Sequence, residues 1–146
     1  MELFLTPSAP FAWSLVLTNA VVVLSIIPLG AARSRANFEM KDMAAPRAMF
    51  DRLPPWGKRA NWAHQNSFES FTLHAPACLL CIIAVLATKE STSLAIGAAL
   101  LHPFLRLVYI FVYIANIPPI RGLCWIGALL CSAILYSEGL KLMLAI

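Results

Sequence analysis

Long apolar stretches separated by shorter polar segments dominate the sequence. They cover approximately residues 11–32, 71–88, 93–114 and 123–144. Each stretch approaches or exceeds the roughly 20 residues that an α-helix needs to cross about 30 Å of hydrocarbon. Strand-period alternation is absent over any useful length, which argues against a membrane barrel. The pattern therefore predicts an all-α integral membrane protein, a single four-transmembrane-helix bundle over residues 1–146, with helices at approximately 9–33, 57–88, 92–115 and 119–144.

The second predicted helix begins with the most polar run of the chain, residues 59–69. Neither Gly nor Pro interrupts residues 58–75, so one helix can carry this run into the apolar stretch that follows. At about 100° per residue, Arg59, Trp62, Asn66 and Glu69 lie on one stripe of that helix. A carboxylate about ten residues, or roughly 15 Å, into a membrane helix is costly unless it faces protein, a partner charge or a ligand. Glu69 is therefore a candidate functional residue.

The third predicted helix contains Arg106, followed at three- and four-residue steps by Tyr109 and Tyr113. An intramembrane arginine with no acidic residue in its own helix needs a partner from elsewhere. Glu69 is the acidic residue that another span offers at the same depth. One interpretation is an Arg106–Glu69 ion pair that holds the bundle together, and this pair is compatible with a binding site beside it.

Composition and charge exclude a soluble domain and indicate an orientation. The 146 residues are 60% hydrophobic and only 12% charged. By the positive-inside rule, eight basic residues against two place the first and third loops in the cytoplasm and both termini outside. This anchoring accounts for the net charge of +4 without a nucleic-acid partner. The eight residues are Arg33, Arg35, Lys41, Arg47, Arg52, Lys58, Arg59 and Arg121, and the two are Lys89 and Lys141.

The four cysteines lie within apolar stretches. Cys78-x-x-Cys81 has the spacing of a redox or zinc half-motif, but no second pair follows at metal spacing. We therefore interpret the cysteines as small buried hydrophobic residues and predict no metal site. The connection over residues 36–57 is about twenty residues long, a length that is usually disordered or functional.

Arg121 stands in the first turn of the fourth predicted helix, where the helix dipole is already positive. An arginine there does not stabilise the helix, but together with free amide donors it suits an anion or a thiolate. The alternative is a positive-inside anchor. His64 lies about 140° from Arg59 around the helix axis, so a supporting or interfacial role suits it better than direct ligand contact.

These residues together resemble a known family. Arg59-Ala60-x-x-Ala63-His64-x-Asn66-x-x-Glu69 resembles the second-helix signature of the membrane-associated proteins in eicosanoid and glutathione metabolism (MAPEG). Arg106-x-x-Tyr109-x-x-x-Tyr113, followed by Pro119-x-Arg121, resembles the signature of their third helix and its exit. The likeness covers essentially the whole chain, which resembles a bacterial-type member similar to the microsomal glutathione transferases.

The resemblance implies a homotrimer that binds glutathione as co-substrate between subunits, near the cytoplasmic face. Asn66 and Glu69 would then hold the ends of the tripeptide, and Tyr109 and Tyr113 would line the site. Arg106 would be the buried partner of the acidic group, and Arg121 would stabilise the thiolate. The remaining candidate binding residues are Arg59, His64 and the basic end of the first helix, Arg33 or Arg35.

Departures from the family pattern keep two functions open. The eicosanoid-forming members have an arginine where this chain has Trp62, and Gly122 and Ser70 replace residues typical of particular branches. We expect a membrane glutathione transferase or peroxidase acting on lipophilic small molecules that arrive from the membrane lipid. The alternative is a non-enzymatic lipid-binding or scaffold protein of the same fold.

Overall fold

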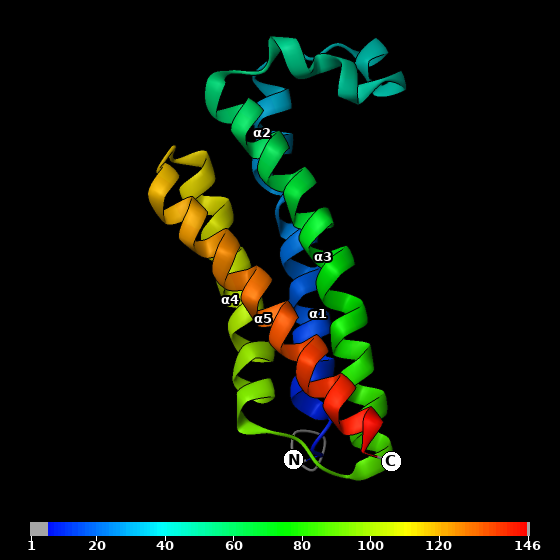
Figure 1. The fold of residues 1–146 in the computed structure, drawn as a ribbon. Coiled ribbons are helices and arrows are strands. Elements are labelled where there is room, and N and C mark those ends of the chain that lie inside the picture. The colour runs from blue at the N-terminus through cyan, green and yellow to red at the C-terminus, as the bar shows by residue number, and fades with distance from the viewer. Residues whose placement is uncertain (1–5, 146) are drawn as a thin grey trace.

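The computed structural model describes residues 6–145. The part of the chain that it describes contains helices and connections and no strand (Figure 1). The first two α-helices belong to one apolar segment of 26 residues, so four segments are long and apolar enough to cross a membrane. The protein is thus an all-α, multi-pass integral membrane protein, as the apolar pattern predicted. The α-helices are α1 (Ala9–Leu24), α2 (Ile26–Ser34), α3 (Pro55–Thr88), α4 (Ser93–Ile114) and α5 (Pro118–Leu144).

The first span is divided at Ser25, between α1 and α2. Pro28 has no backbone N–H, so the carbonyl of Leu24 loses its helical partner there. The Ser25 hydroxyl donates to the carbonyl of Val22 at 2.5 Å and contacts His64 Nδ1 at 2.7 Å. Because the hydroxyl has one proton and gives it to Val22, the imidazole is the donor in the second contact. The hydrogen bond at this break therefore orients the His64 imidazole toward the first span.

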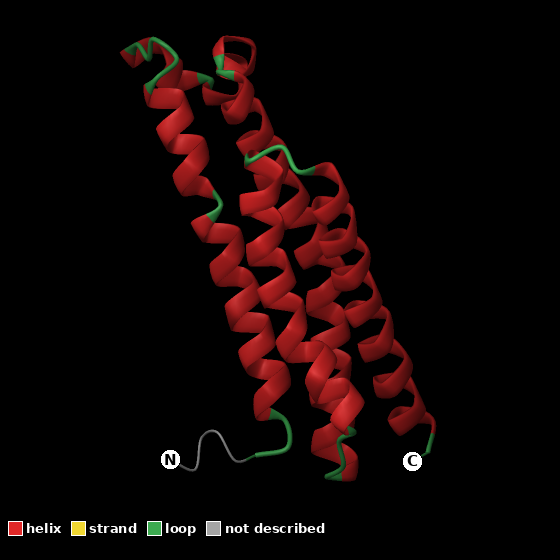
Figure 2. Cartoon of the chain, turned by 90° about the vertical axis from the view of Figure 1, so that its left-hand side faces the viewer, coloured by secondary structure: helices red, strands yellow, loops and turns green. Residues whose placement is uncertain are grey.

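Small residues let the helices approach closely. In lipid there is no hydrophobic driving force between helices, so they are held together largely by close packing. Figure 2 shows the helical segments running side by side along one direction. A Cβ added at Gly139 of α5 would lie 3.0 Å from Leu80 Cγ and 3.2 Å from Cys81 Sγ of α3. All four cysteines are free and buried, which agrees with their interpretation as small core residues. The main cluster of buried residues is Phe11, Ala77, Cys78, Cys81, Val85, Ala95, Ala98, Ala99, Cys131 and Leu135.

A polar seam lies within this bundle. The rings of His74 and His102 stack with centroids 3.4 Å apart, and both side chains are fully buried. Pro103 removes the N–H that would pair with the carbonyl of Ala99, and the Ser14 hydroxyl donates to that carbonyl at 2.5 Å. Ser14 also contacts His74 Nε2 at 2.8 Å. The seam satisfies polar groups that lipid could not satisfy.

The connection between α2 and α3 is folded. It contains two 3-10 helices, η2 (Met40–Ala44) and η3 (Pro46–Arg52). Arg52 Nη2 lies 2.5 Å from Asp42 Oδ1, and the Glu39 backbone N–H donates to Asp42 Oδ2 at 2.9 Å. Hydrophobic residues of the loop pack against α2 and the start of α3, and Met49 is fully buried there. This cluster consists of Leu29, Ala32, Ala36, Met49 and Leu53, with Phe50 and Trp56 packed against it.

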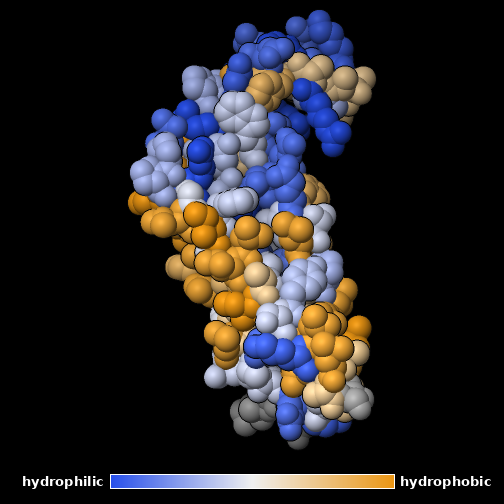
Figure 3. All heavy atoms as spheres, viewed as in Figure 1, coloured by the Kyte–Doolittle hydropathy of each residue, from blue (hydrophilic) through white to orange (hydrophobic). Residues whose placement is uncertain are grey.

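Hydrophilic residues gather at the end of the molecule that carries α2 and the start of α3 (Figure 3). The 34 residues of α3 span about 51 Å, more than the roughly 30 Å of hydrocarbon in a bilayer. If the apolar part of α3 fills the membrane, its first turns extend beyond the hydrocarbon. The polar run therefore lies at the membrane boundary, where water-soluble and lipid-soluble molecules can meet.

Candidate functional site

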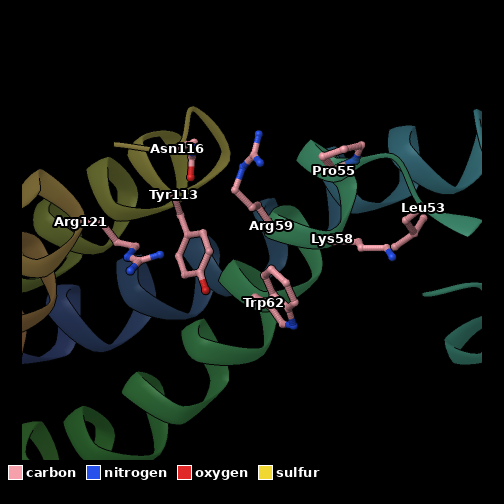
Figure 4. A pocket seen from close by; sticks show the side chains of 8 residues that line it. All are labelled: Leu53, Pro55, Lys58, Arg59, Trp62, Tyr113, Asn116 and Arg121. Carbon is pink, nitrogen blue, oxygen red and sulfur yellow. The ribbon is translucent and has the colours of Figure 1, made fainter. Parts of the chain in front are cut away.

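Two adjoining pockets lie where the start of α3 faces the turn between α4 and α5. The outer pocket has a volume of about 570 Å³, and the inner pocket has a volume of about 400 Å³. Trp62 and Tyr113 line both pockets, so we treat the two adjacent pockets together as the candidate site. The outer pocket is lined by Leu53, Pro55, Lys58, Arg59, Trp62, Tyr113, Asn116 and Arg121 (Figure 4). The inner pocket is lined by Trp62, Gln65, Asn66, Glu69, Tyr109 and Tyr113.

Backbone features of the α4–α5 turn bring its residues to the outer pocket. The helix α4 ends at Ile114, and its carbonyl accepts a hydrogen bond of 2.9 Å from Arg59 Nε of α3. Asn116 has a φ of 62°, the left-handed conformation that asparagine tolerates better than most residues. Pro118 then opens α5 at a position where the missing N–H costs no helical bond. The turn is therefore tied to α3 by one charged side chain.

The outer pocket is lined by three cations and by no acidic side chain. None of Lys58, Arg59 and Arg121 forms an ion pair with a described residue. The Arg121 guanidinium carbon lies 4.6 Å from the centroid of the Tyr113 ring, and Lys58 Nζ lies 5.4 Å from that of Phe50. Figure 4 shows Tyr113 between Arg121 and Trp62. Cations held by aromatic rings retain their charge for an anionic ligand.

The inner pocket contains one carboxylate, Glu69, which is exposed to solvent in the single chain. Asn66 Nδ2 donates to Glu69 Oε2 at 2.9 Å, and Gln65 Nε2 lies 3.5 Å from Glu69 Oε1. Because the carboxylate forms no ion pair with a described residue, it remains available to a cationic group of a ligand. Tyr109 and Tyr113 form the opposite wall, with ring centroids 5.4 Å apart.

Arg106 lies behind the inner pocket and is only 1% exposed. Its guanidinium carbon lies 4.2 Å from the Tyr109 ring centroid, and Nη2 donates to Asn66 Oδ1 at 3.0 Å. Its Nε and Nη1 atoms are buried without a hydrogen-bond partner. The direct Arg106–Glu69 pair that the sequence suggested is not formed in the single chain. The Asn66 amide lies between the two charges and contacts each of them.

Besides Arg106, the sequence-predicted candidates His64, Arg33 and Arg35 line neither pocket. His64 faces α1 through its contact with Ser25, and its ring packs edge-on against Phe68. Arg33 lies in the last turn of α2, with its Nε atom buried and without a hydrogen-bond partner. The neighbouring Arg35 is exposed and lies 5.5 Å from the Trp56 ring centroid. The other candidates, Arg59, Asn66, Glu69, Tyr109, Tyr113 and Arg121, line the pockets, with Arg106 directly behind them.

The structure adds residues that sequence reasoning did not select. Lys58 lines the outer pocket beside Arg59, and its adjacency to that arginine was the available signal. Asn116 reaches the same pocket because the α4–α5 turn folds toward α3. Trp62 was placed on the polar stripe and noted as a departure from the family pattern but was not selected as a site residue, yet it lines both pockets. Its place on the same helical stripe as Asn66 and Glu69 was the signal in the sequence.

Together the pockets suit a flexible molecule with separated charges. Carboxylates of such a ligand would meet the three cations of the outer pocket, and an amine would meet Glu69 in the inner pocket. Charge-assisted hydrogen bonds of this kind are among the stronger ones in proteins. The rings of Trp62, Tyr109 and Tyr113 add apolar area between the charged ends.

Comparison with known proteins assigns the family. The model of the MAPEG family matches residues 10–140, which includes α2 to α4 and most of α1 and α5. No curated protein and no solved structure matches the chain. The four apolar segments long enough to cross a membrane, found within the described residues, agree with the family match. The chain therefore belongs to the MAPEG family, a family of membrane proteins in eicosanoid and glutathione metabolism.

Proposed function

We propose that this protein is a membrane glutathione-dependent transferase or peroxidase. It conjugates or reduces lipophilic electrophiles at a cytoplasmic-side site that lies between the subunits of a homotrimer. The observation that carries the proposal is that two pockets of different charge adjoin and share two lining residues. A pocket lined by three cations adjoins one that contains a free carboxylate, and Trp62 and Tyr113 line both.

Glutathione fits this arrangement of charges. It has two carboxylates, one ammonium group and one thiol along a flexible backbone. Lys58 and Arg59 would bind a carboxylate, and Glu69 would bind the ammonium group with its orientation fixed by Asn66. The thiol, near the middle of the molecule, would then lie between these ends, beside Tyr113 and Arg121.

Arg121 is the residue that would favour the reactive thiolate. A free thiol has a pKa of about 8.5, so a mostly ionised thiol at neutral pH requires a pKa lower by roughly two units, or about 2.7 kcal/mol. A guanidinium at hydrogen-bonding distance near the start of α5 can contribute this amount. Glutathione supplies the sulfur nucleophile, and the protein supplies its ionisation, its position and a route for the lipid-soluble acceptor.

A non-enzymatic lipid-binding or scaffold protein is the second candidate. Trp62 favours it, because tryptophan replaces an arginine of the eicosanoid-forming members and is 44% exposed at the membrane boundary. In this function the three cations of the outer pocket would hold the acidic head of a lipid. The two candidate functions differ in the role of Glu69. It would bind the ammonium group of glutathione, but it would have no partner in a fatty acid, which has no amine.

Thermal unfolding in detergent separates the two candidates. Glutathione at a hundred times its dissociation constant should stabilise the protein by about 2.7 kcal/mol. Lys58→Gln should raise the dissociation constant of glutathione roughly fivefold. This change corresponds to the loss of about 1 kcal/mol, which is typical of one partly exposed charge. Lys41→Gln is the matched control, because Lys41 is an exposed loop lysine that lines neither pocket. Stabilisation by a fatty acid and none by glutathione would favour the scaffold function.

A further inference from the structure

Trp62 differs from the other aromatic side chains of the site in what lies over its ring. Tyr109 has Arg106 at 4.2 Å from its centroid, and Tyr113 has Arg121 at 4.6 Å. Phe50, which contacts Trp62 from the loop, has Lys58 at 5.4 Å. No described cation lies over the Trp62 ring. The negative face of its π system is therefore not used by the protein itself.

The position of Trp62 is nevertheless fixed. Its ring lies 5.6 Å from that of Phe50, at an interplanar angle of 53°. Phe50 is in turn part of the folded loop cluster around Met49. Trp62 remains 44% exposed and lines both pockets, so this contact leaves part of its ring open toward the site. The loop thus orients an electron-rich ring surface that faces the two pockets.

The outer pocket also contains Arg121, the residue proposed to stabilise the thiolate. Trp62 and Arg121 come from different helices, with Tyr113 between them (Figure 4). An acceptor stacked on Trp62 would share this pocket with the sulfur. An electrophilic aromatic ring is electron-poor, and an electron-poor ring is attracted by the negative face of an electron-rich one.

We infer that Trp62 is a specificity-determining residue that selects planar, electron-poor aromatic electrophiles as the second substrate. The inference rests on the proposed function. With a chlorodinitrobenzene, the thiolate sulfur forms a bond to the ring carbon that carries chlorine, and chloride leaves with the bonding electron pair. With an α,β-unsaturated aliphatic aldehyde, sulfur adds to the β-carbon and the α-carbon takes a proton from water. The second acceptor has no ring to stack, so Trp62 contributes little to its binding.

The kinetic test compares these two acceptors at saturating glutathione. Trp62→Leu should raise the KM for the chlorodinitrobenzene roughly five- to tenfold, because the binding free energy of one aromatic contact corresponds to a change of this size. The KM for the aldehyde should change less than twofold, and because glutathione is saturating, any loss of glutathione affinity in the variant is common to both acceptors. Trp62→Phe should restore most of the aromatic selectivity. Phe68→Leu is the matched control, because Phe68 is an exposed aromatic residue of α3 that lines neither pocket.

A binding measurement makes the inference independent of catalysis. In 1,3-dinitrobenzene neither nitro group activates the other as a leaving group, and the compound quenches tryptophan fluorescence. The wild type should show a saturable quenching component that Trp62→Phe lacks, whereas Trp56→Phe should retain it. Saturable quenching without glutathione binding would refute the proposed function and support the aromatic site. Normal conjugation with unchanged acceptor selectivity in Trp62→Leu would overturn the inference and leave the proposed function standing.

Discussion

Asn66 and Glu69 lie one helical turn apart on α3, but they have different surroundings. Asn66 accepts a hydrogen bond from the buried guanidinium of Arg106, whereas Glu69 is exposed and its carboxylate receives hydrogen bonds from two neutral amides of the described residues. Removing the acceptor of a buried charged donor is costly, and changing an exposed carboxylate is not. Substitution of Asn66 should therefore destabilise the fold, whereas the Glu69 carboxylate is available to bind a ligand.

The first prediction follows from this difference. Asn66→Ala should lower the free energy of unfolding by about 1.5–3 kcal/mol, because Arg106 loses its acceptor. Glu69→Gln should change it by less than about 0.5 kcal/mol but should weaken glutathione binding. Thermal unfolding in detergent measures both effects. Adding Arg106→Met to Asn66→Ala should recover part of the loss. A larger destabilisation by Glu69→Gln than by Asn66→Ala would indicate a direct ion pair with Arg106.

At the scale of elements, the junction between α2 and α3 depends on one glycine. A Cβ at Gly57 would lie 2.6 Å from Ala32 Cβ and 3.2 Å from Pro54 Cδ. Neither neighbour is the far end of a flexible side chain, so Gly57→Ala should destabilise the protein by about 1–3 kcal/mol. Gly97→Ala is the control, because a Cβ there meets nothing within 4 Å. The control should be neutral or stabilising by up to about 1 kcal/mol, since alanine is the better helix former. Equal unfolding temperatures for both variants would contradict the close packing.

The folded loop should respond to acid. The backbone N–H of Glu39 and then the Arg52 guanidinium hold the pKa of the Asp42 carboxyl below its ordinary value of 3.8. A lowered carboxyl pKa stabilises the loop above the unfolded-state value, and this stabilisation is lost as pH falls through the folded-state value. Hydrogen exchange of residues 37–53 should therefore accelerate only below about pH 4. In Asp42→Asn the loop should be less protected than in the wild type at neutral pH, and equal protection would refute the role of this carboxylate.

At the scale of the whole molecule, the sequence predicted the fold class because four apolar segments of membrane-spanning length leave few alternatives. It did not predict the break at Ser25, which depends on Pro28 together with a hydrogen bond to His64 on another helix. The folded loop was missed because its stability comes from Met49 and Leu53 packing on α2. The stripe on α3 and the tyrosines of α4 identified half of the residues that line the two pockets. Lys58 and Asn116 were not selected, because their approach depends on how the α4–α5 turn faces α3.

Topology is a further prediction at this scale. Ser34 lies at the end of the first span, on the side predicted to be cytoplasmic, and can be replaced by cysteine. An impermeant maleimide should label it in inverted vesicles and not in intact cells. Glu90→Cys, in the exposed turn between α3 and α4, should show the opposite pattern. The four native cysteines are buried and should contribute little labelling. Labelling of Ser34→Cys in intact cells would place the two pockets outside the cytoplasm.

The central claim is that the paired pockets bind glutathione as a thiolate stabilised by Arg121. The most direct measurement is the ultraviolet absorbance of the bound thiolate, titrated with pH in the wild type, Arg121→Lys and Arg121→Ala. In the wild type the thiol of bound glutathione should have a pKa roughly two units below that of a free thiol, which is about 8.5. Arg121→Lys should be intermediate, since the charge remains and the fork geometry is lost. Arg121→Ala should bind glutathione but lose the thiolate absorbance at neutral pH. A wild type without bound thiolate, or an alanine variant that keeps it, would contradict the claim.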